Sequence, residues 1–88
     1  MTVAQSIRDK LTAAFAPNVL DIVDETHLHR GHGGHQPGVS THFRISIVAP
    51  AFAAKPRVER QRLIYAALGS LIGNPIHALS LSAKAPGE

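Results

Sequence analysis

The 88-residue sequence contains no cysteine and no tryptophan. Without cysteine the chain cannot supply a disulfide, a cysteine-based zinc site or a thiolate nucleophile. Aromatic residues make up only 5% of the sequence, so it gives no sign of a row of exposed rings on which bases could stack. No apolar run approaches the ~18–20 residues of a membrane span, and the N-terminus lacks the apolar core of a secretory signal. We therefore expect a soluble, cytoplasmic protein.

The composition is that of one small globular domain. Forty-four per cent of the residues are hydrophobic and 17% are charged, which favours a folded chain over a disordered one. A single domain over residues 1–88 is expected, with an ordered core at about 3–84. The net charge is +3, a mild excess that permits an acidic partner or a phosphate backbone without requiring either. The basic residues are scattered, except for one run: Lys55, Arg57, Arg60 and Arg62.

The spacing of apolar residues predicts the secondary structure. A stripe with intervals of three or four begins at Val3 and ends at Phe15, which predicts a helix. Thr2 and Gln5 have capping-box spacing, so Thr2 is the expected N-cap, and Gly73 is the expected C′ residue of the longest helix. The complete prediction is helix 3–15, strands 19–26 and 41–48, a short helical turn between Pro50 and Pro56 anchored by Phe52, helix 57–72, strand 76–83 and a frayed tail over AKAPGE.

This order of elements, α-β-β-α-α-β, predicts an α+β fold. The first two strands are expected to form an antiparallel hairpin with an unusually long tip. The last strand follows the long helix and is expected to return to the sheet through a helical crossover. A three-stranded mixed sheet with helices on one face satisfies these constraints.

Histidine is concentrated in one glycine-rich stretch. HLHRGHGGH, residues 27–35, contains four of the six histidines, and it follows the first strand. Neutral imidazole is a common ligand for transition metals, and histidine is also a pH sensor. The spacing is equally compatible with a solvated polar loop, so the three interpretations stay open at this point. His77 lies outside this stretch. In a strand it would point to the same side of the sheet as Leu79 and Leu81, so it is either a histidine at the rim of the core or a ligand.

No catalytic set stands out in the sequence. Asp24 and Glu25 are adjacent and alternate faces of a strand, so they cannot converge as a pair of carboxylates. There is no phosphate-binding loop and no dinucleotide-binding glycine pattern. We do not expect an enzyme.

Four segments together resemble the BolA family: DETHLHRGH, THFRISIVAPAF, RVERQRLIYAAL and IHALSLSAKAPGE. They occur in the order and spacing of BolA proteins, and the resemblance covers about residues 4–86. The fold of that family is similar to a class II KH domain and has the element order predicted above. One position departs from the family pattern, since Gln61 stands between Arg60 and Arg62 where a histidine is usual.

The resemblance implies a concrete activity. BolA proteins pair with monothiol glutaredoxins and share a [2Fe-2S] cluster with the glutaredoxin and glutathione, in cluster trafficking or iron-responsive regulation. By motif, His77 in IHAL matches the invariant histidine of the family. Counting five residues from Asp24 places the loop ligand on His29, with His32 as the alternative. No cluster is expected in the isolated chain.

The same resemblance implies a second function. Some BolA proteins are described as DNA-binding transcription regulators, and here the contact element would be the long helix with Arg57, Arg60 and Arg62, together with Lys55. The two functions are not exclusive. DNA is thus the second candidate partner after the glutaredoxin, and a weak homodimer is also compatible with the sequence.

Overall fold

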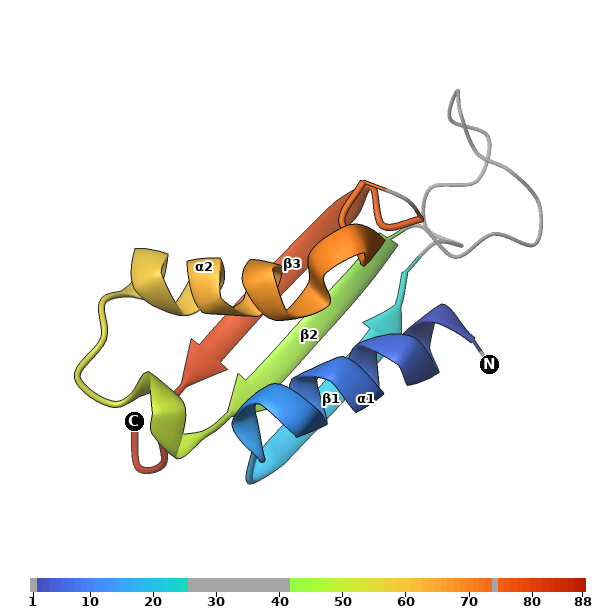
Figure 1. Ribbon diagram of the computed structural model, residues 1–88. Coiled ribbons are helices and arrows are strands. Elements are labelled where there is room, and N and C mark those ends of the chain that lie inside the picture. Colours follow the sequence, from blue (N-terminus) through green and yellow to red (C-terminus); the bar gives the residue numbers. More distant parts are fainter. Residues whose placement is uncertain (1, 26–41, 74) are drawn as a thin grey trace.

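The computed structural model describes residues 2–25, 42–73 and 75–88. Two helices cover one face of a three-stranded sheet (Figure 1). Among these residues, no helix has both the length and the apolar character needed to cross a membrane. The elements are α1 (Val3–Phe15), β1 (Val19–Asp24), β2 (His42–Val48), the 3-10 helix η2 (Pro50–Phe52), α2 (Arg57–Leu68), the 3-10 helix η3 (Gly69–Leu71) and β3 (Ala78–Lys84).

Helix α1 begins and ends where the sequence predicts. The Thr2 hydroxyl accepts the Gln5 backbone N–H at 3.1 Å, and the Gln5 side chain accepts the Thr2 N–H at 2.7 Å. This capping box satisfies two backbone donors that the first turn leaves free. The last helical residue is Phe15, Ala16 is the C-cap with a left-handed φ of 45°, and Pro17 follows.

The sheet has the predicted mixed pairing. Strand β1 is antiparallel to β2, with Val19 opposite Val48. Strand β3 is parallel to β2, with His42 opposite Ala78, and α2 lies in the crossover between them. The predicted fold class, with helices on one face of a mixed sheet, is therefore confirmed.

The core lies between the sheet and the two helices. Phe43 and its alternate neighbours along β2 are buried on the face that the helices cover, as the alternation predicts. Phe52 in η2 is fully buried, and its ring centroid lies 5.0 Å from that of Phe15. The predicted anchor is thus a core residue that joins α1 to the segment before α2. The core comprises Ile7, Leu11, Phe43, Ile45, Ile47, Ala49, Phe52, Ile64, Leu68 and Ile76.

Helix α2 is shorter than predicted. The α-helix ends at Leu68, and Gly69, with φ of 55°, receives the role that was expected of Gly73. Glycine tolerates this positive φ and weakens a helix interior, so the helix ends there and continues only as the tighter η3. Gly73, with φ of 90°, instead forms part of the following turn.

The start of β3 also differs from the prediction. The Gly73 N–H donates to Ile76 O at 2.7 Å, and the Ile76 N–H donates to Leu71 O at 3.0 Å. This closed turn keeps residues 76 and 77 out of the β2–β3 ladder, so the strand begins at Ala78. The alternation of buried and exposed side chains along β3 does not extend into this turn. Ile76 is buried, and His77 is exposed rather than part of the core rim.

The C-terminal segment is folded back, so the prediction of a frayed tail is wrong. Ala85 is buried, and the Glu88 carboxylate accepts two hydrogen bonds from the Arg60 guanidinium, at 2.5 and 2.7 Å. Arg60 also donates to Lys55 O at 2.9 Å and to Ala83 O at 3.0 Å. The Arg60 side chain is only 13% exposed, so one guanidinium joins α2, β3 and the segment before α2.

This arrangement perturbs both ionisable groups. The hydrogen bonds from Arg60, followed by the backbone N–H of Ala85, lower the pKa of Glu88 from 4.5 to about 2. The Glu88 carboxylate in turn raises the pKa of Arg60. Because the folded state lowers the Glu88 pKa, the ion pair contributes stability above pH 4.5, and that contribution is lost as the pH falls toward 2.

We expect Glu88→Gln to lower the midpoint of thermal unfolding at neutral pH and to matter less in acid. The difference between the wild type and the variant should be constant above about pH 5 and should shrink between pH 4.5 and 2. Differential scanning calorimetry across this range measures it. A difference that stays the same down to pH 2 would show that the Glu88 charge does not stabilise the fold.

Phe52→Ala should destabilise the protein by about 3–5 kcal/mol, because it empties a fully buried site and removes the contact with Phe15. Urea unfolding followed by circular dichroism measures the loss. Val58→Ala is the control: Val58 is 57% exposed, and its truncation should change stability by less than about 0.5 kcal/mol. Equal effects of the two substitutions would contradict the assigned core.

Candidate functional site

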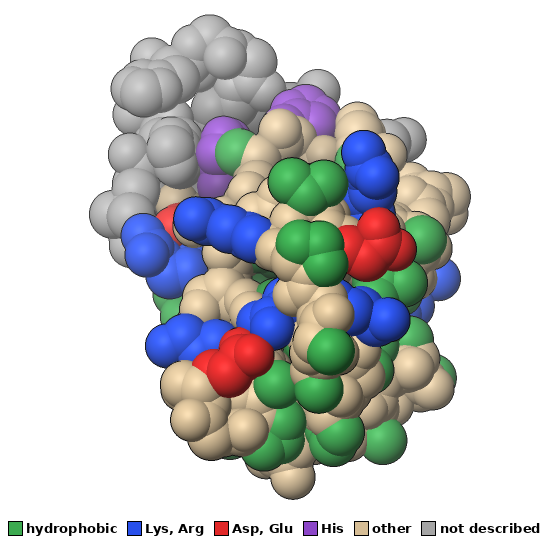
Figure 2. Space-filling model, turned by 90° about the vertical axis from the view of Figure 1, so that its left-hand side faces the viewer, with side chains coloured by type: hydrophobic (Ala, Val, Ile, Leu, Met, Phe, Trp, Pro, Cys, Tyr) green, Lys and Arg blue, Asp and Glu red, His purple; other side chains and the backbone are tan. Residues whose placement is uncertain are grey.

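One end of the sheet gathers the chain segments that carry the predicted histidine ligands. Strand β1 ends there, β2 begins there at His42, and β3 begins there directly after His77. The Glu25 N–H donates to His42 O at 2.8 Å. This hydrogen bond joins the residue that follows β1 to the first residue of β2. Histidine side chains lie at this end of the molecule (Figure 2). The pairing thus brings His77 to the end at which the histidine-rich segment is attached.

His77 is exposed and chemically available. Within the described ranges, no hydrogen bond or ion pair holds its imidazole. A histidine that served the core would be buried, and its ring nitrogens would have partners. The closed turn before β3 fixes the backbone next to His77 and leaves its side chain in solvent. An imidazole in this position is accessible to a group that approaches from solvent.

The loop candidates His29 and His32 lie outside the residues that the structure describes. Chain length sets a bound on their reach: His29 follows Glu25 by four residues, which span at most roughly 14 Å when extended. His32 is three residues further on. Both candidates are therefore tethered to the end of the sheet that carries His77.

The described residues do not by themselves form a metal site. No group of three histidine, aspartate or glutamate side chains in them is placed to hold an ion. His42 lies beside the start of β3, as the partner of Ala78, and is partly buried. A hollow of about 200 Å³ adjoins it, lined by Glu25, His42, Phe43, Ala78, Leu79 and Ser80.

Glu25 at the same end has a structural partner. Its carboxylate accepts a hydrogen bond from Arg44 at 3.0 Å, and the two side chains are 20% and 60% exposed. An ion pair this exposed contributes about 0–1 kcal/mol. Glu25 is thus engaged across the β1–β2 pair, which makes His77 the clearer candidate ligand at this end.

The predicted basic residues of α2 do not form one surface. Consecutive residues in a helix are rotated by about 100° around its axis. Arg60 and Arg62 are two positions apart, so they lie on opposite sides of α2. The Arg60 guanidinium is bound to Glu88 and to two backbone carbonyls. Arg57 and Lys55 are exposed, and no ion pair is recorded for either within the described part of the chain. The set available to a phosphate backbone is therefore smaller than the sequence predicts.

Two structural relations could not be derived from the sequence. The parallel pairing places His42 next to the strand that His77 precedes. Glu88 was assigned to a frayed tail, yet it binds Arg60 from 28 positions away. Nothing in the local pattern indicates such a contact, because it depends on where β3 ends relative to α2.

Known proteins resemble this chain over almost its whole length. Human BolA-like protein 1 is 39% identical over 88 residues, an alignment that covers 98% of this chain and 60% of the human protein. The chain thus spans about 60% of the length of that relative. The DNA-binding transcriptional regulator BolA of Escherichia coli is 33% identical over 81 residues, covering 92% of this chain and 73% of the regulator.

Solved structures agree with these sequence relatives. The structure of BolA1 from Arabidopsis thaliana superposes with a TM-score of 0.86 at 34% identity and covers 98% of this chain and 94% of that one. The sequence model of the BolA-like protein family matches residues 11–88, which include α2, His77 and the C-terminal turn. On these grounds, the chain belongs to the BolA-like protein family.

Proposed function

We propose that this chain is a non-catalytic adaptor that binds a monothiol glutaredoxin and contributes histidine ligation to a [2Fe-2S] cluster shared with it. The observation that carries the proposal is His77, an exposed imidazole without a partner in the described residues. It lies at the end of the sheet to which the histidine-rich segment is attached. Family membership supports the same reading.

The donor set fits a shared cluster. Iron–sulfur clusters are held mainly by cysteine thiolates, and this chain has none. The thiolates would therefore come from the glutaredoxin and from glutathione, while this chain supplies imidazole from His77 and from His29 or His32. A [2Fe-2S] cluster supplies one-electron chemistry, and imidazole in place of thiolate raises its reduction potential.

The chain's own contribution is to position a neutral imidazole. The turn closed by the Gly73–Ile76 and Ile76–Leu71 hydrogen bonds fixes the backbone before His77. The β2–β3 ladder fixes it from Ala78 onward. Only the deprotonated ring nitrogen of an imidazole can bind a metal.

We expect His77→Gln to remove the cluster-dependent change that the wild type produces in a glutaredoxin. Glutamine keeps a polar side chain of similar size at an exposed site but has no imidazole. The measurement is visible circular dichroism after mixing with a cluster-loaded monothiol glutaredoxin, with gel filtration to detect the heterodimer. If wild-type protein leaves the spectrum unchanged and no heterodimer elutes, the proposal fails.

Three variants assign the remaining ligand. His29→Ala should reduce the spectral change in part, and His32→Ala should leave it intact if His29 is the loop ligand. The reverse result would move the assignment to His32. His42→Ala is the matched control at the same end of the sheet. An effect of His42→Ala as large as that of His77→Gln would show that the spectrum reports on the fold.

A second candidate function is DNA binding. The observation that favours it is the pair of exposed cations Lys55 and Arg57 at the start of α2, with Arg62 further along the helix. The Escherichia coli relative is named as a DNA-binding transcriptional regulator. Arg60 is better assigned to the fold, because its guanidinium is bound internally.

If three or four phosphates are contacted, the logarithm of the DNA-binding constant should fall with the logarithm of salt concentration at a slope of about −3. Arg57→Gln should weaken binding at all sequences and reduce the slope by about 1. Fluorescence anisotropy with a labelled duplex measures both. Lys10→Gln, on α1, is the control of equal charge, and an absence of binding at about 50 mM salt contradicts this candidate.

A further inference from the structure

A groove lies between the start of α2 and the end of β3. Its volume is about 560 Å³, and it is lined by Lys55, Arg57, Arg60, Gln61, Leu81, Ser82, Ala83, Lys84 and Glu88. This volume lies within the range of about 300–1,000 Å³ that is typical of small-molecule sites. Along β3 the groove lining begins at Leu81, four residues or roughly 13 Å from His77, and extends to Lys84 at the far end of the strand.

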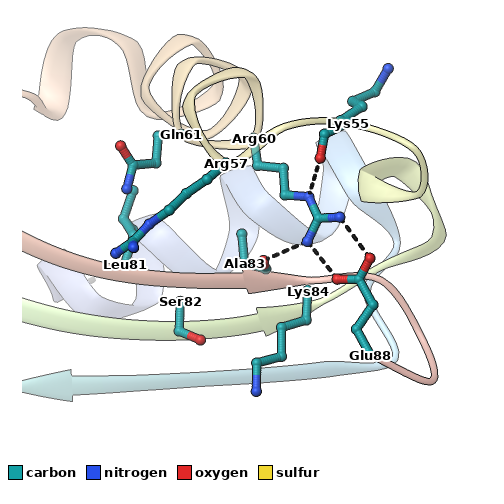
Figure 3. Close-up of a pocket in the computed structure, with 9 residues that line it drawn as sticks. All are labelled: Lys55, Arg57, Arg60, Gln61, Leu81, Ser82, Ala83, Lys84 and Glu88. Atoms are coloured by element: carbon teal, nitrogen blue, oxygen red, sulfur yellow. Dashed lines mark hydrogen bonds and ion pairs between the residues drawn. The ribbon is translucent and has the colours of Figure 1, made fainter.

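The charges that line the groove are unbalanced. Four of its residues are cationic and only Glu88 is anionic. Figure 3 shows Arg57 extended from α2 toward Leu81 and Arg60 directed at Glu88, while the Lys55 and Lys84 ammonium groups lie at the margins. In the described ranges no carboxylate pairs with Arg57. One guanidinium of the groove is thus occupied and the other is not.

The contact made by Glu88 shows which kind of chemical group the groove can bind. Its carboxylate binds the Arg60 guanidinium with both oxygens, the bidentate geometry that arginine offers to carboxylates and phosphates. One oxygen also accepts the Ala85 N–H at 3.0 Å. The Arg60 side chain is only 13% exposed and that of Glu88 is 42% exposed, so the groove holds an anionic group that stays partly in solvent.

We propose that the groove is a binding site for a small organic or inorganic polyanion, one that carries at least two carboxylate or phosphate groups. One anionic group takes the place of Glu88 on Arg60, and a second binds Arg57. Glu88 then acts as an internal competitor that occupies the site when the ligand is absent.

The depth of Arg60 favours a small ligand over a nucleic acid. A backbone phosphate of a duplex stays outside the protein surface and would meet Arg57 or Lys55. The Arg60 side chain is less exposed than these two, and its guanidinium donates to the Ala83 carbonyl of β3 at 3.0 Å. A carboxylate on a short side chain already reaches it, as Glu88 demonstrates.

The test is a titration of the full chain, labelled with nitrogen-15, with citrate and with inorganic pyrophosphate at constant ionic strength. Saturable shifts are expected at the amides of Arg57, Gln61 and Ala85. Acetate, with one carboxylate, should give no saturation below the same concentration. Arg57→Gln should weaken binding by about tenfold, as expected for the loss of a charge-assisted contact. Glu88→Gln should strengthen it several-fold, because the competitor is removed.

Two substitutions on α1 separate site binding from general charge effects. Lys10→Gln changes the net charge as Arg57→Gln does, and Asp9→Asn changes it as Glu88→Gln does; neither residue lines the groove. Both controls should bind like the wild type. Controls that match the groove variants, or shifts spread evenly over the basic residues, would overturn the proposal. Binding of duplex DNA at the groove without any binding of citrate or pyrophosphate would overturn it too.

Discussion

The parallel pairing of β2 with β3 is the constraint on which the positions of the candidate residues depend. A parallel neighbour requires a crossover, and α2 with its flanking 3-10 helices supplies it on the face that already carries α1. The pairing of His42 with Ala78 brings the start of β3 to the end of the hairpin. The pairing of Val48 with Lys84 brings the other end of β3 close to the start of α2.

These two ends of β3 have different chemistry. At one end the chain presents an imidazole that nothing in the described residues holds, next to the attachment points of the histidine-rich segment. At the other it presents guanidinium groups, one of which a carboxylate already occupies. A ligand at one end need not contact the other, since the groove lining begins about 13 Å along the strand from His77. The proposed histidine ligation and the proposed anion binding should therefore be separable by mutation.

The parts of the fold that short-range patterns determine were predicted from the sequence. The capping box of Thr2 with Gln5 spans three residues, and the alternation along β2 needs only the strand itself. The mixed sheet followed from the order of the elements. One error has a local cause that the apolar pattern does not encode. The hydrogen bonds of the turn that joins Leu71, Gly73 and Ile76 displace the start of β3 and expose His77.

For the candidate sites, too, some residues were identified from the sequence, whereas their environment was not. Motif matching identified His77 as a residue of interest, but its exposure follows from the closed turn and was not predicted. The loop histidines His29 and His32 lie outside the described residues, so their assignment stays a prediction. The tie between Arg60 and Glu88 had no signal in the sequence, because each residue alone resembles a solvated charge. The two residues come together only because the chain that follows β3 lies next to α2 in the folded protein.

The internal bonding of Arg60 changes how the basic segment should be interpreted. A run of arginines in a helix is usually considered a single surface, and loss of function after a substitution in it is attributed to a lost phosphate contact. Here the Arg60 guanidinium joins α2 to Ala83 in β3, to the Lys55 carbonyl and to Glu88. A substitution of Arg60 would therefore loosen the crossover as well as remove a cation. Arg57 is exposed and has no such bonds to the described residues, so it is the position at which the proposed recognition of an anion can be tested separately from stability.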